Sequence, residues 1–509
     1  MPQPLAVSLP GANIHHVMNK LKRDVIVIGA GPVGLFLARE LVRYGHSVLL
    51  VEKNSRQSEH SKALAVMPRT LEVFEMAGIV APFVAAAHVV TKASVISGER
   101  RLGVLPIEPA SSRYPYVAMI PQDVTEQLLL AELERVGGSV SYGTEALGLA
   151  QTDDEVRVQL RSGEAEEWIS AAYVVGTDGA HSVVRHALGL DFEGGAYAAA
   201  FVLADIETSG NVPADEMQLC PHQSGALACF PISASRRRIV AMVDEPPVGA
   251  PDLALVQRLL DARGLAELRA ERLIWSSNFK IHHRRASDMR KGRAFLAGDA
   301  AHIHSPFGAQ GMNTGLQDAW NLAWKLRFAL AGRANPALLD SYSAERHEVA
   351  GRVIRITDAI TRAMASRSWL AQAIRDRAIP ILTQLDAFKK LFVDTLSELS
   401  VGYPHSAVVR GSGRRAPDEP LGEGERLFEC LGARFVLVAP RSAPPFDDIA
   451  SRYSELLSRK AHANAEGVRL VRPDGYIAFE SNTATPQDAA RLEQVLEKQV
   501  RLLDAAARA

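Results

Sequence analysis

Three glycines and one acidic residue near the start of the chain have the types and spacing of a dinucleotide-binding site. Gly29, Gly31 and Gly34 form a Gly-x-Gly-x-x-Gly motif between an apolar strand and a helix that begins near Pro32. Glycines permit the tight turn and let the backbone approach a pyrophosphate, whose charge the unpaired N–H groups of the helix N-terminus stabilise. Glu52 ends the next strand, where it can accept hydrogen bonds from ribose hydroxyls. The motif predicts a dinucleotide but does not distinguish FAD from NAD.

An Asp-Gly pair in the middle of the chain forms the second polar feature. Asp178-Gly179 follows the apolar stretch Val174-Val175-Gly176 and leads through a polar turn into a helix that contains Arg185. Taken by itself, the pattern is typical of an ordinary strand–turn–helix junction in which Asp178 caps the helix. Its interpretation as a ligand-binding turn therefore depends on the other motifs.

A third polar turn lies near residue 300. The strand at residues 294–297 ends in Gly298-Asp299, which can place a carboxylate against a ribityl-type polyol. Pro306 then opens a glycine-rich turn that runs through Gly311-Met312-Asn313 into a predicted helix over residues 316–331. Because backbone N–H groups at a helix N-terminus stabilise anions, this helix could accommodate negative charge on a reduced flavin.

The elements around these motifs predict an α/β fold. Residues 25–28 and 48–51 have the apolar pattern of buried parallel strands, and residues 121–136 form an amphipathic helix stopped by two glycines. Further strand-like stretches follow at residues 139–149, 155–160 and 168–175.

Residues 190–290 differ in character and predict a mainly antiparallel sheet that could cover a cavity. Turn-rich loops separate its short strands, and one helix is expected near residues 252–269. A ligand bound against this sheet would be largely apolar. The strands are expected at about residues 198–207, 225–232, 238–243 and 273–282, with inward side chains that include Phe201, Leu203, Leu227, Cys229, Phe230 and Met242.

The composition limits the class of protein. The 509 residues suffice for about three domains, and the formal net charge of −1 argues against a nucleic-acid or anionic-membrane partner. No apolar run approaches the roughly 20 residues that span a bilayer, and the first 23 residues lack the continuous apolar region of a signal peptide. The three cysteines are too scattered for a disulfide framework or a metal site. We therefore predict a cytoplasmic protein without a bound metal.

Together and in this order, the three motifs resemble those of the FAD-dependent aromatic hydroxylases, the single-component flavoprotein monooxygenases typified by p-hydroxybenzoate hydroxylase and phenol hydroxylase. The resemblance covers roughly residues 22–400. It extends through residues 414–418, 435–438 and 470–476, which look like the thioredoxin-like C-terminal domain of the longer, polyketide-hydroxylase-like members. No Cys-x-x-Cys occurs there, so this domain cannot perform thioredoxin redox chemistry.

The resemblance implies a fold with five segments. The fold class is α/β, with a discontinuous Rossmann-like FAD-binding domain and an antiparallel-sheet substrate domain. The predicted segments are an N-terminal extension at 1–21, the FAD-binding domain at 22–190 and 285–352, the substrate sheet at 191–284, a helical linker layer at 353–401 that is kinked or broken at Pro380, and the thioredoxin-like domain at 402–509, whose last helix starts at Thr485.

The resemblance also implies roles for single residues. Glu52 would bind the adenosine ribose, Asp299 would meet the ribityl-pyrophosphate, and Asp178 is associated with both FAD and the pyridine nucleotide. The residues implied to bind cofactor are Gly29, Gly31, Pro32, Gly34, Glu52, Lys53, Lys62, Gln122, Asp178, Gly179, Asp299, Pro306, Gly311, Met312 and Asn313. The residues predicted to line the substrate pocket are Leu227, Cys229, Phe230, Pro306 and Phe307.

Two positions depart from the family pattern, and no catalytic residue is assigned. The family usually has Arg where Lys62 stands, so the charge is kept without bidentate phosphate binding. It often has Gly where Ala309 stands, which alters how closely the backbone can approach a flavin. His302 is interpreted as a packing and hydrogen-bonding residue rather than a catalytic base.

The implied activity is an NAD(P)H-consuming monooxygenase that hydroxylates an aromatic, phenolic or polyketide-type substrate through a flavin C4a-hydroperoxide. FAD would be the cofactor, NADPH or NADH a transient reductant and O2 a co-substrate, since no second glycine motif follows a strand. The same chemistry could instead serve Baeyer–Villiger insertion or epoxidation. The motifs are also compatible with a flavin reductase or dehydrogenase and with a flavin-binding module that has no turnover. A monomer or a homodimer is expected.

Overall fold

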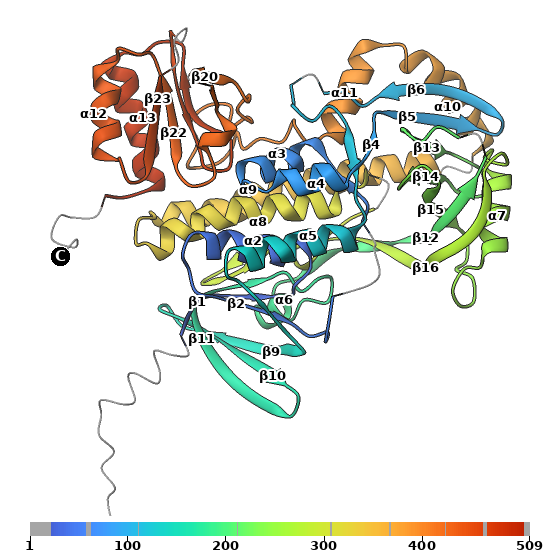
Figure 1. The fold of residues 1–509 in the computed structure, drawn as a ribbon, viewed down its shortest axis with the longest axis horizontal. Coiled ribbons are helices and arrows are strands. Elements are labelled where there is room, and N and C mark those ends of the chain that lie inside the picture. Colours follow the sequence, from blue (N-terminus) through green and yellow to red (C-terminus); the bar gives the residue numbers. More distant parts are fainter. Residues whose placement is uncertain are drawn as a thin grey trace, which may run out of the picture.

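The structure is a computed structural model that describes residues 22–57, 63–109, 111–210, 212–305, 308–365, 368–422, 424–461 and 466–502. A parallel sheet forms one part of the molecule, and a mostly antiparallel sheet and a four-stranded sheet lie at its two ends, with α8 (Gly311–Leu330) between them (Figure 1). The predicted α/β fold class is confirmed. The predicted N-terminal extension at residues 1–21 lies outside the described residues.

The parallel sheet carries all three polar motifs at one edge. β1 (Arg23–Ile28) lies in its centre, with β2 (Val48–Glu52) and β11 (Ala165–Gly176) parallel on either side. β18 (Ala294–Leu296) pairs with β11 in the same direction. Because the carboxyl ends of parallel strands meet at one edge, the residues that follow β1, β2, β11 and β18 come together there.

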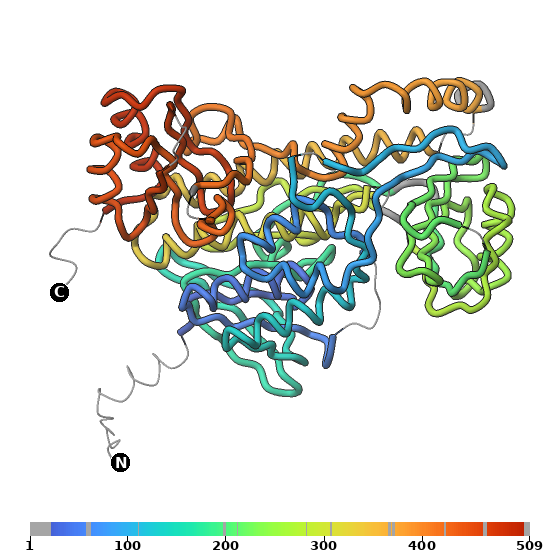
Figure 2. Tube along the Cα trace, turned by 45° about the horizontal axis from the view of Figure 1, so that its top comes forward, coloured from blue at the N-terminus to red at the C-terminus, as the bar shows by residue number. Residues whose placement is uncertain are grey.

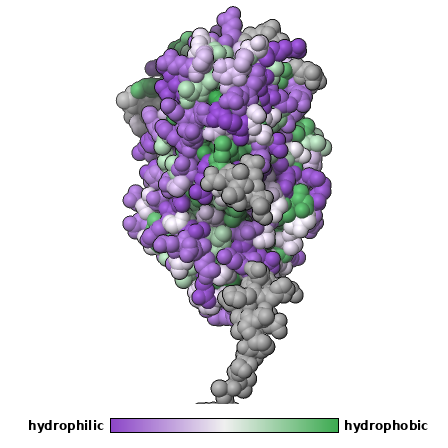
Figure 3. Space-filling view, turned by 90° about the vertical axis from the view of Figure 1, so that its left-hand side faces the viewer, coloured by the Kyte–Doolittle hydropathy of each residue, from purple (hydrophilic) through white to green (hydrophobic). Residues whose placement is uncertain are grey.

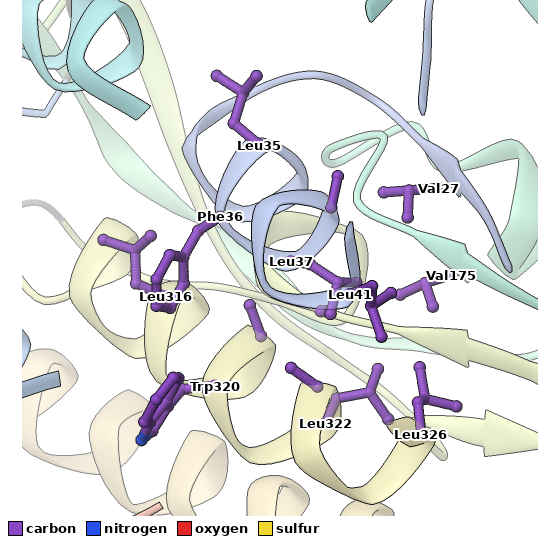
Figure 4. Close-up of a cluster of buried hydrophobic side chains, with 14 of the residues drawn as sticks. Val27, Leu35, Phe36, Leu37, Leu41, Val175, Leu316, Trp320, Leu322 and Leu326 are labelled. Carbon is purple, nitrogen blue, oxygen red and sulfur yellow. The ribbon is translucent and has the colours of Figure 1, made fainter. Parts of the chain in front are cut away.

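A helix that begins at the glycine motif packs between this sheet and α8. α2 (Pro32–Arg43) buries Leu35, Phe36, Leu37 and Leu41, and Figure 4 shows these side chains with Val27 and Val175 of the sheet and Leu316, Trp320, Leu322 and Leu326 of α8. The rings of Phe36 and Trp320 stack with centroids 5.9 Å apart. Burial of these side chains fixes the helix N-terminus relative to α8.

The antiparallel sheet is assembled around one long strand. β12 (Phe192–Ser209) pairs with β15 (Arg236–Val243) on one side and with β16 (Arg269–Ala286) on the other. Helix α7 (Leu253–Ala262) covers one face and is shorter than predicted, because β16 already begins at residue 269. The sheet order is β19 (His302–Ile303), β16, β12, β15, β14 (Leu227–Pro231), β13 (Glu216–Cys220), β5 (Lys92–Ser97) and β6 (Arg100–Pro106).

Two strands of this sheet come from a part of the chain assigned to the FAD-binding domain. β5 (Lys92–Ser97) and β6 (Arg100–Pro106) form a hairpin, and β5 pairs in parallel with β13 (Glu216–Cys220). The strands that pair are more than 100 residues apart in sequence, so no local pattern indicates the contact. The predicted boundaries 22–190 and 191–284 therefore do not separate the two sheets.

The helical layer differs from its prediction in two details. α9 (Pro336–Ala365) begins well before residue 353 and runs as one helix, followed by α10 (Trp369–Leu382) and α11 (Asp386–Leu396). Pro380 lies inside α10, which ends two residues later, so it lies in the last turn and not at a break. α10 and α11 both contact β6.

The C-terminal domain is a four-stranded sheet in the order β23-β22-β24-β25 with α12 (Pro444–Arg452) and α13 (Pro486–Gln499). The predicted start of α13 is confirmed, since the Thr485 hydroxyl accepts a hydrogen bond from Asp488 N and the Asp488 carboxylate accepts one from Thr485 N. Figure 2 shows this domain at the end of the molecule opposite the antiparallel sheet.

A buried ionic network joins the C-terminal domain to α8 and α9. Arg472 donates to both oxygens of Glu345 on α9, at 2.6 and 2.9 Å, and to Asp474, at 3.0 Å for its Nε. Lys325 of α8 donates to the same Glu345 at 2.8 Å. Burial works to raise the pKa of Glu345, but Arg472 and Lys325 outweigh it and hold that pKa well below its usual range. The network fixes the C-terminal domain against the central helix.

The remaining helices and strands complete the architecture. They are β3 (Ala65–Val66), α3 (Pro68–Met76), α4 (Val80–Ala86), β4 (His88–Val90), β7 (Val117–Met119), α5 (Gln122–Arg135), β8 (Val140–Tyr142), β9 (Thr144–Gln151), β10 (Val156–Ser162), α6 (Val183–Ala187), β14 (Leu227–Pro231), β17 (Arg290–Lys291), β19 (His302–Ile303), β20 (Pro420–Gly422), β21 (Glu425–Arg426), β22 (Phe435–Ala439), β23 (Leu457–Ala461), β24 (Val468–Val471) and β25 (Ile477–Ser481).

The surface at the C-terminal end of the molecule is mostly hydrophilic. Where grey atoms do not cover it, hydrophobic side chains occupy only small, scattered areas of this face (Figure 3). None of the helices in the described part of the chain is both long and apolar enough to cross a membrane. Within the same residues, no group of three or more His, Cys, Asp and Glu side chains could hold a metal ion.

Replacing Arg472 by Met should destabilise the protein strongly, because it leaves the carboxylates of Glu345 and Asp474 buried without their main partner. We expect the free energy of unfolding to fall by about 3–5 kcal/mol. Arg414→Met is the matched control, since Arg414 pairs with Glu480 but is 55% exposed, and it should cost less than about 1 kcal/mol. Urea unfolding measures both, and equal effects of the two substitutions would contradict a stabilising network.

Candidate flavin site

The glycine motif and the Asp-Gly turn are in direct contact at the carboxyl edge of the parallel sheet. Thr177 N donates to Ile28 O at 2.8 Å, and the Thr177 hydroxyl donates to Gly29 O at 2.7 Å. These bonds hold the turn after β11 against the turn after β1. Two motifs that lie about 150 residues apart in sequence therefore form one surface.

At two of the three glycines a side chain would clash with neighbouring backbone, and at the third the space is open. Gly29 has φ +101°, and a Cβ there would lie 2.6 Å from Thr177 O. A Cβ on Gly34 would lie only 1.9 Å from Gly29 O. At Gly31, which caps the N-terminus of α2, no atom of the described residues lies within 4 Å of an added Cβ. The loop thus packs tightly underneath and leaves room where a pyrophosphate would approach.

Glu52 is held at the same edge by backbone donors. Its Oε2 accepts from Ala30 N at 3.0 Å, and its Oε1 accepts from the backbone and side-chain nitrogens of Asn54 at 3.0 and 2.7 Å. The carboxylate is therefore oriented at the start of the glycine loop. Lys53 follows it in an exposed turn.

Gln122 binds the chain rather than presenting a free amide. Its Oε1 accepts from Ala63 N at 3.0 Å and its Nε2 donates to Glu126 at 2.8 Å. Burial raises the pKa of Glu126 to about 7. Gln122 therefore anchors the residue that follows segment 58–62, and the predicted site residue Lys62 of that segment lies outside the described residues.

Asp178 binds the first turn of α6 with one oxygen only. Its Oδ2 accepts from Val183 N at 2.7 Å, while Oδ1 is buried and has no hydrogen-bond partner among the described residues. Burial, the largest cause, raises the pKa of this carboxyl. The N-cap of α6 is Ser182, whose hydroxyl accepts from Arg185 N at 3.0 Å, so Asp178 supports the first turn of the helix without being its cap residue. Gly179, beside Asp178, has φ +76°.

Arg185 links the second motif to the third. Its guanidinium donates to Ala180 O and to Ala300 O, both at 2.8 Å, and lies 3.8 Å from the ring centre of Phe192. The Asp-Gly turn and the Gly-Asp turn are therefore held together by one buried side chain. The sequence placed Arg185 in the motif but gave no reason to assign it this role.

Asp318 of α8 fixes the Gly-Asp turn from behind. Its carboxylate accepts from Gly298 N at 3.0 Å, from His302 Nε2 at 2.7 Å and from Arg346 Nε at 2.6 Å. The side chains of Asp318, His302 and Arg346 are all buried. Asp299, which follows Gly298 in the chain, is exposed at the edge of the sheet. The structure places His302 as the predicted hydrogen-bonding residue. Asp318 and Arg346 were missed because neither lies in a recognisable motif.

The side chain of Asn313, in the first turn of α8, is bound within the chain. Asn313 Oδ1 accepts from Met67 N, and its Nδ2 donates to Ala65 O and Ala309 O, each at 2.9 Å. Ala309 has φ +50°, a left-handed conformation that glycine adopts without strain. Gly311, Met312 and Asn313 therefore offer only the N–H groups that lack partners within the helix.

The predicted substrate-pocket residues lie on two different faces of the antiparallel sheet. Leu227 and Cys229 pack with Val256 and Leu260 of α7, so they face away from Phe230. Burial raises the pKa of the Cys229 thiol to about 12. This placement corrects the sequence-based expectation that both line a pocket, because alternate residues of a strand point to opposite faces.

The opposite face of the sheet carries aromatic side chains. The rings of Phe201 and Phe279 stack with centroids 6.0 Å apart and an interplanar angle of 21°. Phe230, Trp275 and Met364 of α9 pack against the same cluster. The predicted pocket residues Pro306 and Phe307 lie outside the described residues.

The described residues fit FAD. The space at Gly31 suits a pyrophosphate at the N-terminus of α2, Glu52 suits a ribose, and Asp299 and the N-terminus of α8 can meet a polyol and an electron-rich ring. Two helix N-termini at one sheet edge thus provide two separate sites for negative charge.

Comparison with known families divides most of the chain into two matches. Residues 22–357 match the family described as the FAD binding domain, and residues 410–500 match the aromatic-ring hydroxylase C-terminal domain. The first match alone spans more than half of the chain. Residues 358–409, which include α10 and α11, lie between the two matches.

Relatives match along nearly the whole length. The chain is 34% identical over 501 residues to the 12-dehydrotetracycline 5-monooxygenase/anhydrotetracycline 6-monooxygenase of Streptomyces rimosus, covering 92% of this chain and 96% of that protein. It is 32% identical over 484 residues to the aromatic compound monooxygenase YhjG of Bacillus subtilis, with the same coverage. The solved structure of the anhydrotetracycline hydroxylase OxyS from Streptomyces rimosus has a TM-score of 0.79 at 32% identity, covering 94% of this chain and 99% of that one.

Replacing Gly31 by Ala should weaken FAD binding without unfolding the protein. The added methyl group meets no described atom, so the free energy of unfolding of the apoprotein should change by less than about 1 kcal/mol. It would occupy the space for the pyrophosphate, so the FAD dissociation constant should rise at least about tenfold, or about 1.4 kcal/mol. Gly148→Ala, in equally open space on β9, should leave both quantities unchanged. Unaltered FAD affinity in Gly31→Ala would contradict this placement.

Proposed function

The chain belongs to the FAD-dependent aromatic-ring hydroxylases, and on that premise we propose that it hydroxylates a polycyclic phenolic or polyketide-type substrate. It is an FAD-dependent monooxygenase, with NAD(P)H as reductant and O2 as co-substrate. When bound, FAD supplies the activation of O2 and the transfer of one oxygen atom to an electron-rich ring. The observation that carries the substrate class is the aromatic face of the antiparallel sheet, against which Met364 of α9 packs.

The chain's own residues would bind and orient the cofactor. The N–H groups at the N-terminus of α2 would hold the pyrophosphate and Glu52 the adenosine ribose, and by the family pattern Lys53, Lys62 and Gln122 would also contact the cofactor. Asp299 would bind the ribityl chain, and the unpartnered oxygen of Asp178 could accept from the cofactor or from the nicotinamide nucleotide. The first N–H groups of α8 would stabilise negative charge on the reduced ring. These assignments combine the family pattern with the geometry at the sheet edge.

The aromatic cluster would form the wall against which the substrate lies. Phe279 and Trp275, which are partly buried and pack against the cluster that contains the fully buried Phe201, would offer flat apolar surfaces that bind fused rings and exclude water from the reacting atoms. We assign no catalytic base, because a phenol is already electron-rich. The tetracycline-type relatives support a polycyclic rather than a monocyclic substrate.

Substrate-dependent oxygen consumption tests the proposal. The FAD-loaded protein is mixed with NADPH or NADH and a panel of monocyclic phenols and polycyclic hydroxyaromatics. We expect polycyclic members to stimulate both NAD(P)H oxidation and O2 uptake, with labelled oxygen from O2 appearing in the product as a hydroxyl group. A lactone or epoxide product would favour Baeyer–Villiger insertion or epoxidation instead. NAD(P)H oxidation without oxygen in any product would indicate a reductase, and no turnover would indicate a binding module.

Phe279→Ala and Leu227→Ala test which face of the antiparallel sheet binds the substrate. Phe279 is half-buried in the aromatic cluster, so its loss should raise the KM for a polycyclic substrate about tenfold or more, with a smaller effect on a monocyclic one. Leu227 packs on the α7 face, so its loss should cost about 2–5 kcal/mol of stability and leave KM unchanged. Steady-state kinetics and urea unfolding give both readings. A change in KM for Leu227→Ala alone would show that the substrate lies on the α7 face.

A further inference from the structure

The last turn of α11 and the segment that follows it brace the N-terminal turns of α8. Gln310, which caps α8, donates to Thr395 O at 2.9 Å, and Ser397 O accepts from Arg69 N of α3 at 3.2 Å. The carboxyl group of Glu398 accepts from the Thr314 hydroxyl at 3.4 Å and from the amide of Gln317. Because α8 begins at residue 311, this carboxyl lies beside the first two turns of the helix.

Glu398 occupies a position that favours a different residue. Its φ is +59°, in the left-handed region where glycine is unstrained, and only 3% of the residue is exposed. Both the backbone conformation and the burial of a carboxyl group are costly. A glycine would avoid both costs and still allow the Ser397 contact with α3. The retained carboxyl group therefore points to a function of the side chain.

The charged groups that face Glu398 do not neutralise a carboxylate there. Arg346 of α9 lies nearby, but its guanidinium already donates to Asp318, to Tyr403 and to Thr314 O. Asp318 of α8, which also binds His302, adds a negative charge. α3 contributes a backbone N–H to this segment. Burial raises the pKa of Glu398 to about 8, with Arg346 acting in the opposite direction.

We propose that Glu398 is a positioning residue that takes up a proton when the FAD at the N-terminus of α8 is reduced and releases it on reoxidation. This inference rests on the proposed location of the flavin ring. A hydride from NAD(P)H adds two electrons and leaves negative charge on the ring, beside the same helix N-terminus. A carboxylate at Glu398 would place a second negative charge beside the same end of the helix. That charge is removed when a proton from water binds the carboxylate and forms the O–H bond of the carboxyl group.

The reduction potential of the bound FAD, measured against pH, tests the coupling. Above a pH of about 8 the wild-type potential should fall more steeply with pH than that of Glu398→Gln, which cannot take up the proton. Glu348→Gln, an exposed change of the same type on α9, should follow the wild type. Glu398→Gly keeps the left-handed backbone without strain and should behave as Glu398→Gln. Superimposable slopes for the wild type and both Glu398 variants would overturn the proposal.

The apoprotein provides a second reading that needs no cofactor. A buried acid whose pKa rises from 4.5 to about 8 on folding binds more protons in the native state, so stability falls as pH rises through that interval. Between pH 4.5 and about 8, the free energy of unfolding of the wild type should therefore decrease relative to that of Glu398→Gln. Above a pH of about 8, the two curves of unfolding free energy against pH should run parallel. Parallel curves throughout would overturn the proposal. Absence of oxygen transfer by the wild type would instead refute the proposed function and leave this titration intact.

Discussion

The site depends on one buried carboxylate that joins three elements. Asp318 binds the backbone of the Gly298 turn, His302 and Arg346 at once, so α8, α9 and the third motif cannot move independently. A buried charge is stable only when it is paired and hydrogen-bonded, and here the pairing is complete on both oxygens. The position of the third turn relative to α8 follows from this requirement.

Further polar side chains of α8 make buried contacts toward the C-terminal domain. Asp318, Asn321 and Lys325 are three and seven residues apart and therefore share one face of α8. Asn321 donates to Glu345 and to Asp474, and Lys325 donates to Glu345, so the polar stripe runs from the flavin site into the Arg472 network. The C-terminal domain lacks the cysteines for redox chemistry, but its contact with α8 makes it part of the support for the site.

The parts predicted from sequence are those whose signal is local. The glycine motif with its strands, the α13 capping box and the three polar turns depend on neighbouring residues, and the structure has each of them. The pairing of β5 with β13 depends on residues far apart in the chain, so no pattern could indicate it. The faces of β14 were assigned wrongly for a related reason. Alternation separates Leu227 from Phe230, but only the position of α7 decides which face is covered.

The amino-acid sequence by itself determined the dinucleotide-binding motif and the order of the three motifs, because these depend on glycines, acidic residues and apolar strands at fixed spacing. The resemblance of the three motifs to those of the aromatic hydroxylases then implied FAD and the family. Only the tertiary structure decided which side chains at the candidate flavin site remain available to bind a ligand. It assigned the amide groups of Asn313 and Gln122 to partners within the chain, left one oxygen of Asp178 without a partner among the described residues, and buried Glu398 beside α8. Hydrogen-bond partners and burial are set by contacts between distant segments, and a single sequence does not contain those contacts.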